Sequence, residues 1–260
     1  MRVALITGGT SGIGLSFARA LARKGAALVL VARDQTRLDA VAAELSAAHG
    51  VGVETLVADL ADRADQARVA DRLRVGDIDT LVNNAGFSLK TPLVGGDDDL
   101  ADRAYEVMGR APRVLAAAAA GVMRERGEGW IINVASVSAL TRQDSYSALK
   151  AYALALTEVL ALELVGTGVH VTAVLPGWTR TGFHAKGGSR KGVPGFLWLD
   201  ADRVAREALR DARAGVVISI PSKRYKAAAA LLQLLPNWAM RAVSGRIRSK
   251  SKTPAEGATS

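Results

Sequence analysis

The sequence contains no cysteine, and aromatic residues make up only 5% of its 260 positions. Without cysteine the chain has no disulfides, no thiolate metal sites and no cysteine nucleophile, which favours a reducing compartment. No apolar run reaches the length of about 18 residues that a membrane-spanning helix needs, and the N-terminus is not typical of a secretory leader. Hydrophobic residues (49%) and charged residues (23%) exclude a disordered or collagen-like chain. We therefore expect a globular, cytoplasmic protein.

Acidic residues are scarce at one end of the chain. The formal net charge is +9, from 34 Lys and Arg against 25 Asp and Glu. Residues 216–260 hold 8 of these bases and 1 acid, a difference of +7, which leaves 26 bases and 24 acids, a difference of +2, for residues 1–215. A nearly neutral body argues against a nucleic-acid partner, and the basic tail indicates a terminal element with its own partner.

Short aliphatic runs alternate with amphipathic helical stretches. The seven expected strands are Val3–Ile6, Leu28–Val31, Val53–Val57, Thr80–Val82, Trp130–Val134, Val169–Leu175 and Val216–Ile220. The clearest helices are Gly14–Arg23, Arg37–His49, Arg63–Arg74 and Tyr146–Leu164. Apolar strands that alternate with helices predict an α/β fold with a parallel sheet covered on both faces. We expect one doubly wound domain over residues 1–221, a basic amphipathic helical extension over 222–247, and a disordered tail over 248–260.

A glycine-rich turn joins the first strand to the first helix. The turn contains Gly8, Thr10, Ser11, Gly12, Ile13 and Gly14. Glycines there permit a tight turn and let the backbone approach a pyrophosphate, which the helix N-terminus favours electrostatically. The turn predicts a dinucleotide-binding site, the alternative being a tight turn without a ligand.

The end of the second strand indicates which dinucleotide binds. NAD-dependent dehydrogenases usually carry an acid there to hold the ribose 2′-OH, whereas an arginine accommodates a 2′-phosphate. Ala32 stands where the acid is expected, and Arg33 follows it. We therefore predict NADP(H). The alternative is that Arg33 pairs with Asp34 or Asp39 on the surface.

Tyr146 and Lys150 lie four residues apart at the start of a predicted helix, and thus on one helical face. A nearby ammonium favours the phenolate, so Lys150 should lower the pKa of Tyr146 and make it a usable acid or base. Ser136, at the end of the fifth strand, offers a hydroxyl to a carbonyl or alkoxide oxygen. The three histidines, His49, His170 and His184, lie on separate elements without acidic neighbours at ligand spacing, so no metal site is predicted.

Together these motifs resemble the short-chain dehydrogenase/reductase family, from Val3 to about Ile220. Further matches are Asp59-Leu60, Asn83-Asn84-Ala85-Gly86 and Pro176-Gly177-Trp178-Thr179-Arg180-Thr181, each at a strand end. The resemblance implies a Rossmann fold, a homodimer or homotetramer, and Tyr146, Lys150 and Ser136 as catalytic residues, with Lys150 also on the nicotinamide ribose. It places Asp59 and Leu60 at the adenine. It places Asn84 near a cofactor ribose, in the segment with Ala85 and Gly86. Thr179 and Thr181 would contact the carboxamide, next to Pro176 and Gly177.

Two positions depart from the family pattern. Only ten residues separate Ser136 from Tyr146, where about thirteen are common in the family, so Ser138 is an alternative to Ser136. Met108 stands where many members carry an asparagine that anchors a proton-relay water, and a thioether cannot replace an amide donor. The proton relay would then use another route, or turnover would be low.

The tail and the region after Thr181 bear on the substrate. The family forms its substrate lid there, and Phe183, Phe196 and Trp198 suit an apolar ligand. Basic residues flank the apolar, Trp238-containing segment after Pro221, which is typical of a helix lying on a membrane surface; the alternative is a helix packed on the domain or on another subunit.

We predict an NADP(H)-dependent oxidoreductase that interconverts a carbonyl and a secondary alcohol on a small, lipophilic molecule. A 3-oxoacyl thioester reductase is the alternative within the family. A catalytically weak nucleotide-sensing or scaffolding protein is the alternative from another class, since Met108 and the tail depart from the family pattern.

Overall fold

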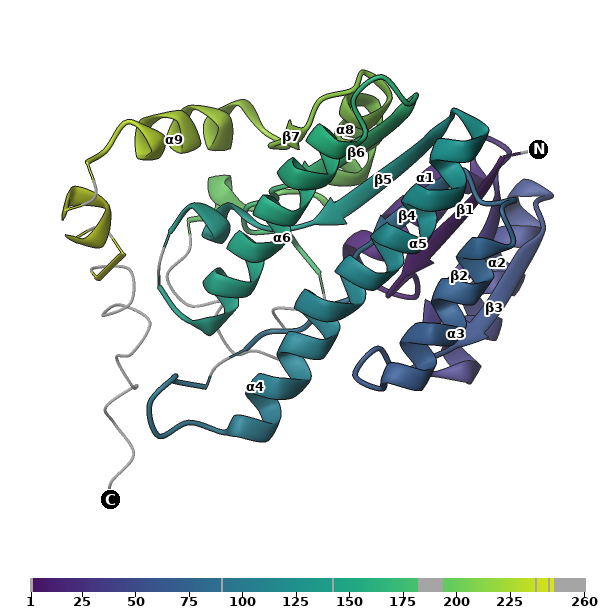
Figure 1. The fold of residues 1–260 in the computed structure, drawn as a ribbon, viewed down its shortest axis with the longest axis horizontal. Helices are drawn as coiled ribbons and strands as arrows, with labels where there is room; N and C mark the ends of the chain where they lie inside the picture. The colour runs from purple at the N-terminus through teal and green to yellow at the C-terminus, as the bar shows by residue number, and fades with distance from the viewer. Residues whose placement is uncertain are drawn as a thin grey trace.

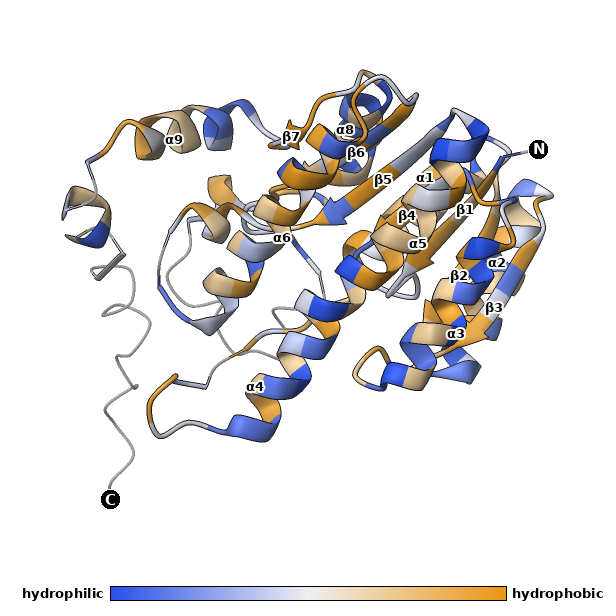
Figure 2. Cartoon of the chain, in the orientation of Figure 1, coloured by the Kyte–Doolittle hydropathy of each residue, from blue (hydrophilic) through white to orange (hydrophobic). Residues whose placement is uncertain are grey.

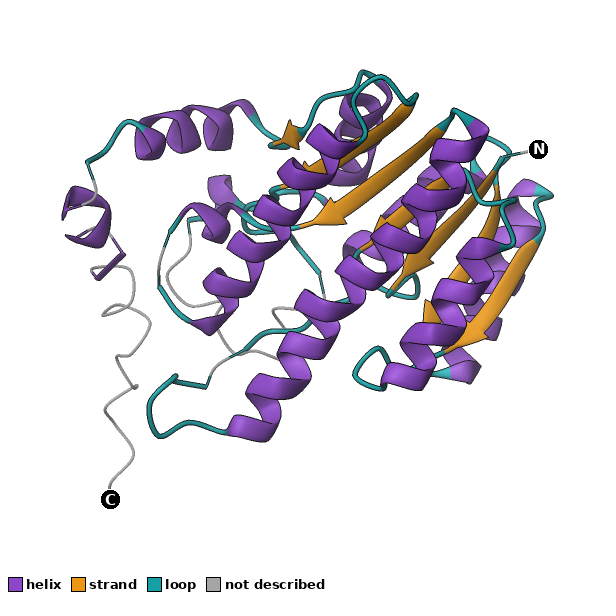
Figure 3. Ribbon diagram, viewed as in Figure 1, coloured by secondary structure: helices purple, strands orange, loops and turns teal. Residues whose placement is uncertain are grey.

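In the computed structural model, residues 2–89, 91–141, 143–181, 194–236, 238–242 and 244–245 are described. Seven strands form one parallel sheet in the order β3-β2-β1-β4-β5-β6-β7 (Figures 1 and 3). The strands are β1 (Val3–Thr7), β2 (Ala27–Ala32), β3 (Val53–Val57), β4 (Thr80–Asn83), β5 (Gly129–Val134), β6 (Val169–Val174) and β7 (Ile218–Ser219). The predicted doubly wound sheet with seven strands is confirmed.

Helices cover both faces of the sheet. On one face lie α3 (Arg63–Arg74), α5 (Ala111–Arg126) and α6 (Ser145–Glu163), which share a buried cluster with Leu5, Leu81 and Ile131 of the strands. On the other face lie α1 (Gly12–Ala22), α2 (Gln35–His49) and α8 (Ala201–Arg213), which pack on Ile6, Leu30 and Val82. Alternate side chains of β1, β2, β4 and β5 enter the two clusters, as the two-residue period of a strand requires. Most of the length of the strands is accordingly orange in Figure 2.

The chain reverses its direction of winding between β1 and β4. From β1 the sheet grows outward to β2 and β3, and the chain then returns to place β4 on the other side of β1. In an open parallel sheet, ligands bind beside the carboxyl ends of the strands at such a reversal. The glycine turn follows β1 and Asn84 follows β4, so both predicted binding segments begin at this point.

A π-helix, η1 (Glu106–Arg110), interrupts one long helical segment between α4 (Asp98–Tyr105) and α5. Such single turns occur frequently at functional sites. Two short 3-10 helices also occur, η2 (Val137–Leu140) directly after Ser136 and η3 (Gly195–Leu197) before α8. The sequence pattern gave no indication of the π-helix.

Helix α9 (Lys223–Gln233) follows β7 at the end of the sheet opposite β3 (Figure 1), and residues 238–242 are again helical. The predicted extension over 222–247 thus contains helix among its described residues, while its division from the domain at residue 221 stays a prediction. The predicted disordered tail over 248–260 lies outside the described residues.

Candidate active site

The glycine turn is a close-packed backbone structure. Gly8 and Gly12 have φ angles of +65° and +55°, in the left-handed region that glycine adopts without steric cost. A Cβ atom on Gly14 would lie 2.3 Å from the Gly8 oxygen. A Cβ atom on Gly12 would lie 3.2 Å from the Cβ atom of Thr181. The turn therefore touches the segment after β6, as two predicted cofactor-binding segments must if they share one ligand.

The first turn of α1 is suited to an anion. Ser11 is the N-cap residue, but its side chain makes no capping hydrogen bond, and the first turn contains no acidic residue. Helix N-termini present unpaired N–H groups and a partial positive charge. Thr10 is buried and Ile13 half-buried beside this turn. The residues present fit a pyrophosphate, whose negative charge this helix terminus would stabilise.

Asn84 ties the turn to the end of β4. Its side-chain Nδ2 donates to the Thr7 oxygen at 3.0 Å and to the Gly8 oxygen at 3.3 Å. The hydroxyl oxygen of Thr7 accepts from the backbone N–H groups of Asn84 and Ala85, at 3.0 and 3.1 Å. Asn84 thus supports the turn directly, and Thr7, which the sequence analysis did not single out, is the acceptor at the centre of the junction. In the sequence, only the position of Thr7 directly before Gly8 could have indicated this role.

The ends of β2 and β3 bring charged residues together. An Asp59 carboxyl oxygen lies 2.6 Å from a guanidinium nitrogen of Arg103, on α4. Burial opposes the charge of Asp59, but the hydrogen bonds from Arg103 and the Ala61 N–H, with the nearby charge of Arg33, hold its pKa below the usual range. Leu60, next in the chain, is buried. Arg103 carried no motif, and only the fold brings α4 to this strand end.

Arg33 is exposed beside this group. Among the described residues, Arg33 forms no ion pair with Asp34 or Asp39, which was the alternative to cofactor binding. The Asp34 carboxylate accepts from the Arg37 backbone N–H, and the Asp39 carboxylate accepts from the Gln35 side chain. The Arg33 guanidinium acts electrostatically on Asp59 instead. A cation therefore stands at the strand end where the sequence predicts the 2′-phosphate.

Ser136, Tyr146 and Lys150 form one connected group. The Ser136 hydroxyl is hydrogen-bonded to the Tyr146 phenol, and the Lys150 Nζ lies 5.6 Å from the centroid of the Tyr146 ring. Lys150 is only 6% exposed and donates to the Val134 oxygen at 2.9 Å. The helix that carries Tyr146 and Lys150 begins with a capping box between Asp144 and Ser147, which fixes its first turn.

The expected effect of Lys150 on Tyr146 is wrong. Burial raises the pKa of the Tyr146 phenol above its ordinary value and the Asp144 carboxylate adds to the rise, while the Ser136 hydrogen bond acts in the opposite direction. The Lys150 ammonium lies over the ring and donates to the Val134 oxygen, and it does not offset the effect of burial. Burial lowers the pKa of Lys150 itself to about 8. At neutral pH the phenol keeps its proton and the amine is mostly charged.

Ser138 is less well placed than Ser136 to meet Tyr146. Its backbone N–H donates to the Ser136 hydroxyl oxygen at 3.1 Å, and its own hydroxyl oxygen is buried without a hydrogen-bond partner among the described residues. The compact loop thus uses Ser138 to orient Ser136.

Met108 lies in the π-helix and is 2% exposed. A Cβ atom on Gly86 would lie 3.2 Å from the Met108 sulfur and 3.8 Å from the Lys150 Nζ. Gly86 therefore lies between Met108 and Lys150. The segment from Asn84 to Gly86 begins beside the glycine turn, and its last residue lies next to the Lys150 side chain. These contacts make the predicted cofactor and catalytic residues parts of one continuous strand-end edge.

The segment after β6 continues this edge. Pro176 and Thr179 are buried, and the Pro176 oxygen accepts from the Val137 N–H at 3.1 Å, next to Ser136. The Trp178 and Trp198 ring centroids lie 5.8 Å apart, and Phe196 is 64% exposed. Phe183 lies outside the described residues.

Two residues of α9, Arg224 and Tyr225, also reach this segment. The Tyr225 hydroxyl donates to the Leu197 oxygen at 2.9 Å and accepts from the Trp178 N–H at 3.2 Å. The Arg224 guanidinium donates to the Phe196 oxygen at 2.9 Å. Both belong to the predicted basic extension, and no sequence motif assigns them a role at the site. No local signal could have found them, because 28 residues separate each from its acceptor.

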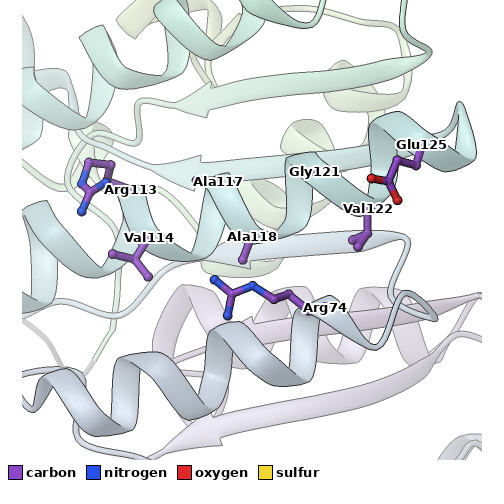
Figure 4. A pocket seen from close by; sticks show the side chains of 8 residues that line it. All are labelled: Arg74, Arg113, Val114, Ala117, Ala118, Gly121, Val122 and Glu125. Carbon is purple, nitrogen blue, oxygen red and sulfur yellow. The ribbon is translucent and has the colours of Figure 1, made fainter.

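A surface groove away from this edge is lined by none of the predicted site residues. The groove lies between α3 and α5 and is lined by Arg74, Arg113, Val114, Ala117, Ala118, Gly121, Val122 and Glu125 (Figure 4). Within the described ranges, no three His, Cys, Asp or Glu side chains are grouped as a metal site would require. No described helix combines the length and apolar character needed to cross a bilayer.

Comparison with known proteins identifies the family. The model of the short chain dehydrogenase family matches residues 2–191. The chain belongs to the short-chain dehydrogenase family. A putative ketoacyl reductase of granaticin polyketide synthesis from Streptomyces violaceoruber is 40% identical over 193 residues, which cover 69% of this chain and 68% of that protein.

Two solved structures resemble the whole chain. One, a short-chain dehydrogenase from Sphingobium yanoikuyae in complex with NADPH, is 35% identical with a TM-score of 0.83, covering 100% of this chain and 99% of the other. The second, a bulky-bulky ketone specific alcohol dehydrogenase from Comamonas testosteroni, is 31% identical with a TM-score of 0.77, covering 100% and 97%. This chain is thus an oxidoreductase with the fold of its family.

Proposed function

We propose that this short-chain dehydrogenase is an NADP(H)-dependent oxidoreductase that interconverts a carbonyl and a secondary alcohol on a lipophilic small molecule. The observation that carries the proposal is the contact of Ser136 with Tyr146, above Lys150, on the edge that also holds the glycine turn. A proton donor, its hydrogen-bond partner and a buried cation lie together where an open parallel sheet binds its ligands.

The residues present define the protein's part in the reaction. The Ser136 hydroxyl and the Tyr146 phenol hold the carbonyl oxygen, and Tyr146 gives that oxygen its proton during reduction. Burial raises the pKa of Tyr146, so the phenol is protonated at neutral pH and carries the proton that reduction requires. Lys150 supplies positive charge that favours the phenolate left behind. When bound, the nicotinamide supplies or accepts the hydride.

The predicted binding residues contact different parts of the cofactor. Gly8, Gly12, Gly14 and the α1 N-terminus hold the pyrophosphate, with Thr10, Ser11 and Ile13 in the same turn. Asp59 and Leu60 border the adenine. Asn84 supports the turn from the segment that continues through Ala85 and Gly86 to Lys150. Pro176, Gly177, Thr179 and Thr181 form the wall at the nicotinamide end.

Arg33 is the proposed selector of the 2′-phosphate. The similarity to a structure solved with NADPH supports this assignment. Dissociation constants for NADPH and NADH, measured for wild type and Arg33→Ala, test it. We expect NADPH binding to weaken about 10- to 100-fold, with NADH binding little changed, as the loss of a charge-assisted contact implies. If the ratio of the NADPH and NADH dissociation constants is the same in wild type and Arg33→Ala, Arg33 does not select the 2′-phosphate.

The activity itself is tested by NADPH consumption with aliphatic, aromatic, steroid-like and acyl-thioester carbonyls. Tyr146→Phe, which keeps the ring and removes the proton, should abolish turnover, and Ser136→Ala should lower it by a factor of about 100 or more. Turnover that survives in Tyr146→Phe would overturn the mechanism. Cofactor binding without turnover on any class would favour a nucleotide-sensing or scaffolding protein.

The second candidate function is reduction of 3-oxoacyl thioesters. Its support is the 40% identity to the putative ketoacyl reductase of granaticin polyketide synthesis. The thioester arm of the same screen separates the candidates: a kcat/KM for an acetoacetyl thioester well above that for any simple ketone would select the second.

Two proposals concern partners. We expect a homodimer or homotetramer, which light scattering would measure. Peripheral membrane contact is proposed for the extension because Leu231, Leu234 and Trp238 are 67%, 81% and 71% exposed, and exposed lysines and arginines occur in the same segment. Flotation with anionic liposomes tests this: equal recovery of wild type and Leu231→Asp/Trp238→Ala in the soluble fraction would remove it.

A further inference from the structure

We propose that Arg224 and Tyr225 of α9 are positioning residues that hold residues 194–199 against the site, and that they thereby determine how well bulky ketones are accepted. The proposal rests on the proposed carbonyl reductase function. It concerns an element that follows the last strand of the sheet.

Tyr225 bridges two chain segments with one hydroxyl group. It accepts from the Trp178 N–H and donates to the Leu197 oxygen, so each hydrogen-bonding role of the phenol is used. A Cβ atom on Gly177 would lie 2.0 Å from the Tyr225 Cζ atom, so the ring occupies space that only a glycine at 177 leaves open. Burial raises the pKa of Tyr225, and it stays a protonated donor at neutral pH.

Arg224 adds a second attachment one residue away. Its guanidinium donates to the Phe196 oxygen at 2.9 Å and lies 5.7 Å from the centroid of the Phe196 ring. Phe196 therefore has both its backbone and its ring held from α9, although its side chain is 64% exposed. An exposed aromatic side chain on a fixed backbone can present a constant apolar surface to a ligand.

The held segment is joined directly to the predicted nicotinamide end. The Leu199 N–H donates to the Trp178 oxygen at 2.7 Å, and the Arg180 N–H donates to the Leu199 oxygen at 2.9 Å. Thr179 and Leu199 form a parallel bridge, and the Trp178 and Trp198 rings are in contact range. A shift of residues 194–199 would therefore change the apolar surface beside Thr179 and Thr181.

Helix α9 is itself packed against the domain through a buried residue, Ala229. Ala229 is buried in a cluster with Ala135 and Leu175 of the strand ends, and Val137 of η2 and Tyr225 pack against that cluster. Ala135 and Val137 are the two neighbours of Ser136. The same helix thus contacts the loop of the catalytic serine on one side and the 194–199 segment on the other.

The test compares Tyr225→Phe, Arg224→Met and the control Lys226→Met, which removes a cation from an exposed position of the same helix. The readouts are kcat and KM for acetophenone and for the bulkier valerophenone, the dissociation constant for NADPH, and hydrogen–deuterium exchange of the Trp178 amide and residues 194–199.

In Tyr225→Phe we expect faster exchange at Trp178 and in 194–199. The KM for valerophenone should rise about tenfold, as the loss of a buried hydrogen bond implies, while the KM for acetophenone, kcat and NADPH binding change by less than about twofold. Arg224→Met should change the same quantities in the same direction, and Lys226→Met none of them.

Exchange that stays at the wild-type rate in both variants would overturn the proposal. Equal KM changes for the two ketones, or a parallel loss of NADPH binding, would also overturn it, since either result indicates a general loss of structure. Absence of turnover in the wild type would count against the proposed function, and the exchange rates would still decide whether α9 positions the segment.

Discussion

Replacing Lys150 by methionine should stabilise the protein while it destroys the site. Lys150 is 6% exposed, and burial lowers its pKa from 10.5 to about 8. At 1.36 kcal/mol per pKa unit, holding the charged amine in the folded protein costs about 3 kcal/mol below pH 8. Methionine avoids this cost but removes the donor to the Val134 oxygen, a loss of about 1 kcal/mol. The net gain in unfolding free energy is about 2 kcal/mol at pH 7.

The pH dependence of that gain identifies its cause. Between pH 8 and 10.5 the unfolded chain binds more protons at Lys150 than the folded chain does, so wild-type stability rises with pH through this window. The advantage of Lys150→Met should therefore shrink from pH 8 upward, reach zero between about pH 9.5 and 10, and become a deficit of about 1 kcal/mol above pH 10.5, where only the lost hydrogen bond remains. Urea unfolding of both proteins at pH 7 and pH 10 measures it, with the exposed Lys226→Met as control. A variant no more stable than wild type at pH 7, or a difference independent of pH, would refute the reasoning.

Carbonyl reduction should decline as pH rises through about 8, because Lys150 loses its charge there; a pH profile of kcat/KM that is flat from pH 7 to 9 would contradict this. Ser222→Gly should raise the unfolding free energy by about 1 kcal/mol, because Ser222 has a φ angle of +142° and such strain costs about 1–3 kcal/mol, less the greater unfolded freedom of glycine; thermal unfolding measures it, and Ser222→Ala, which retains the strain, is the control. Met108→Asn should raise kcat with KM unchanged, since it restores an amide beside Gly86 and Lys150; a fall in kcat would argue that Met108 is required as it is.

The strands and helices could be predicted because their signals are local. Each strand is a short aliphatic run between turns, and six of the seven observed strands agree with prediction within one residue at each end; only the edge strand β7, at two residues, is shorter than expected. The π-helix could not be predicted, because a single wide turn leaves the apolar spacing of Glu106–Arg110 close to that of an ordinary helix.

The pKa of Tyr146 shows where reasoning from spacing fails. Its separation of four residues from Lys150 correctly places both side chains on one helical face. Spacing does not determine how deeply each is buried or where the ammonium points, and burial is the largest cause of both pKa shifts. Desolvation is a property of the assembled core, so its outcome required the structure.

The sequence by itself determined the fold class and the glycine turn, and it predicted Ser136, Tyr146 and Lys150 as a group, because each signal depends on residue type at short separation. Only the tertiary structure brought Arg103 to Asp59 and Thr181 to Gly12. It also placed Arg224 and Tyr225 of α9 against residues 196 and 197. The basic tail had suggested only a separate partner. Contacts between distant segments depend on how the sheet orders its strands and where each crossover helix ends, which no local pattern records.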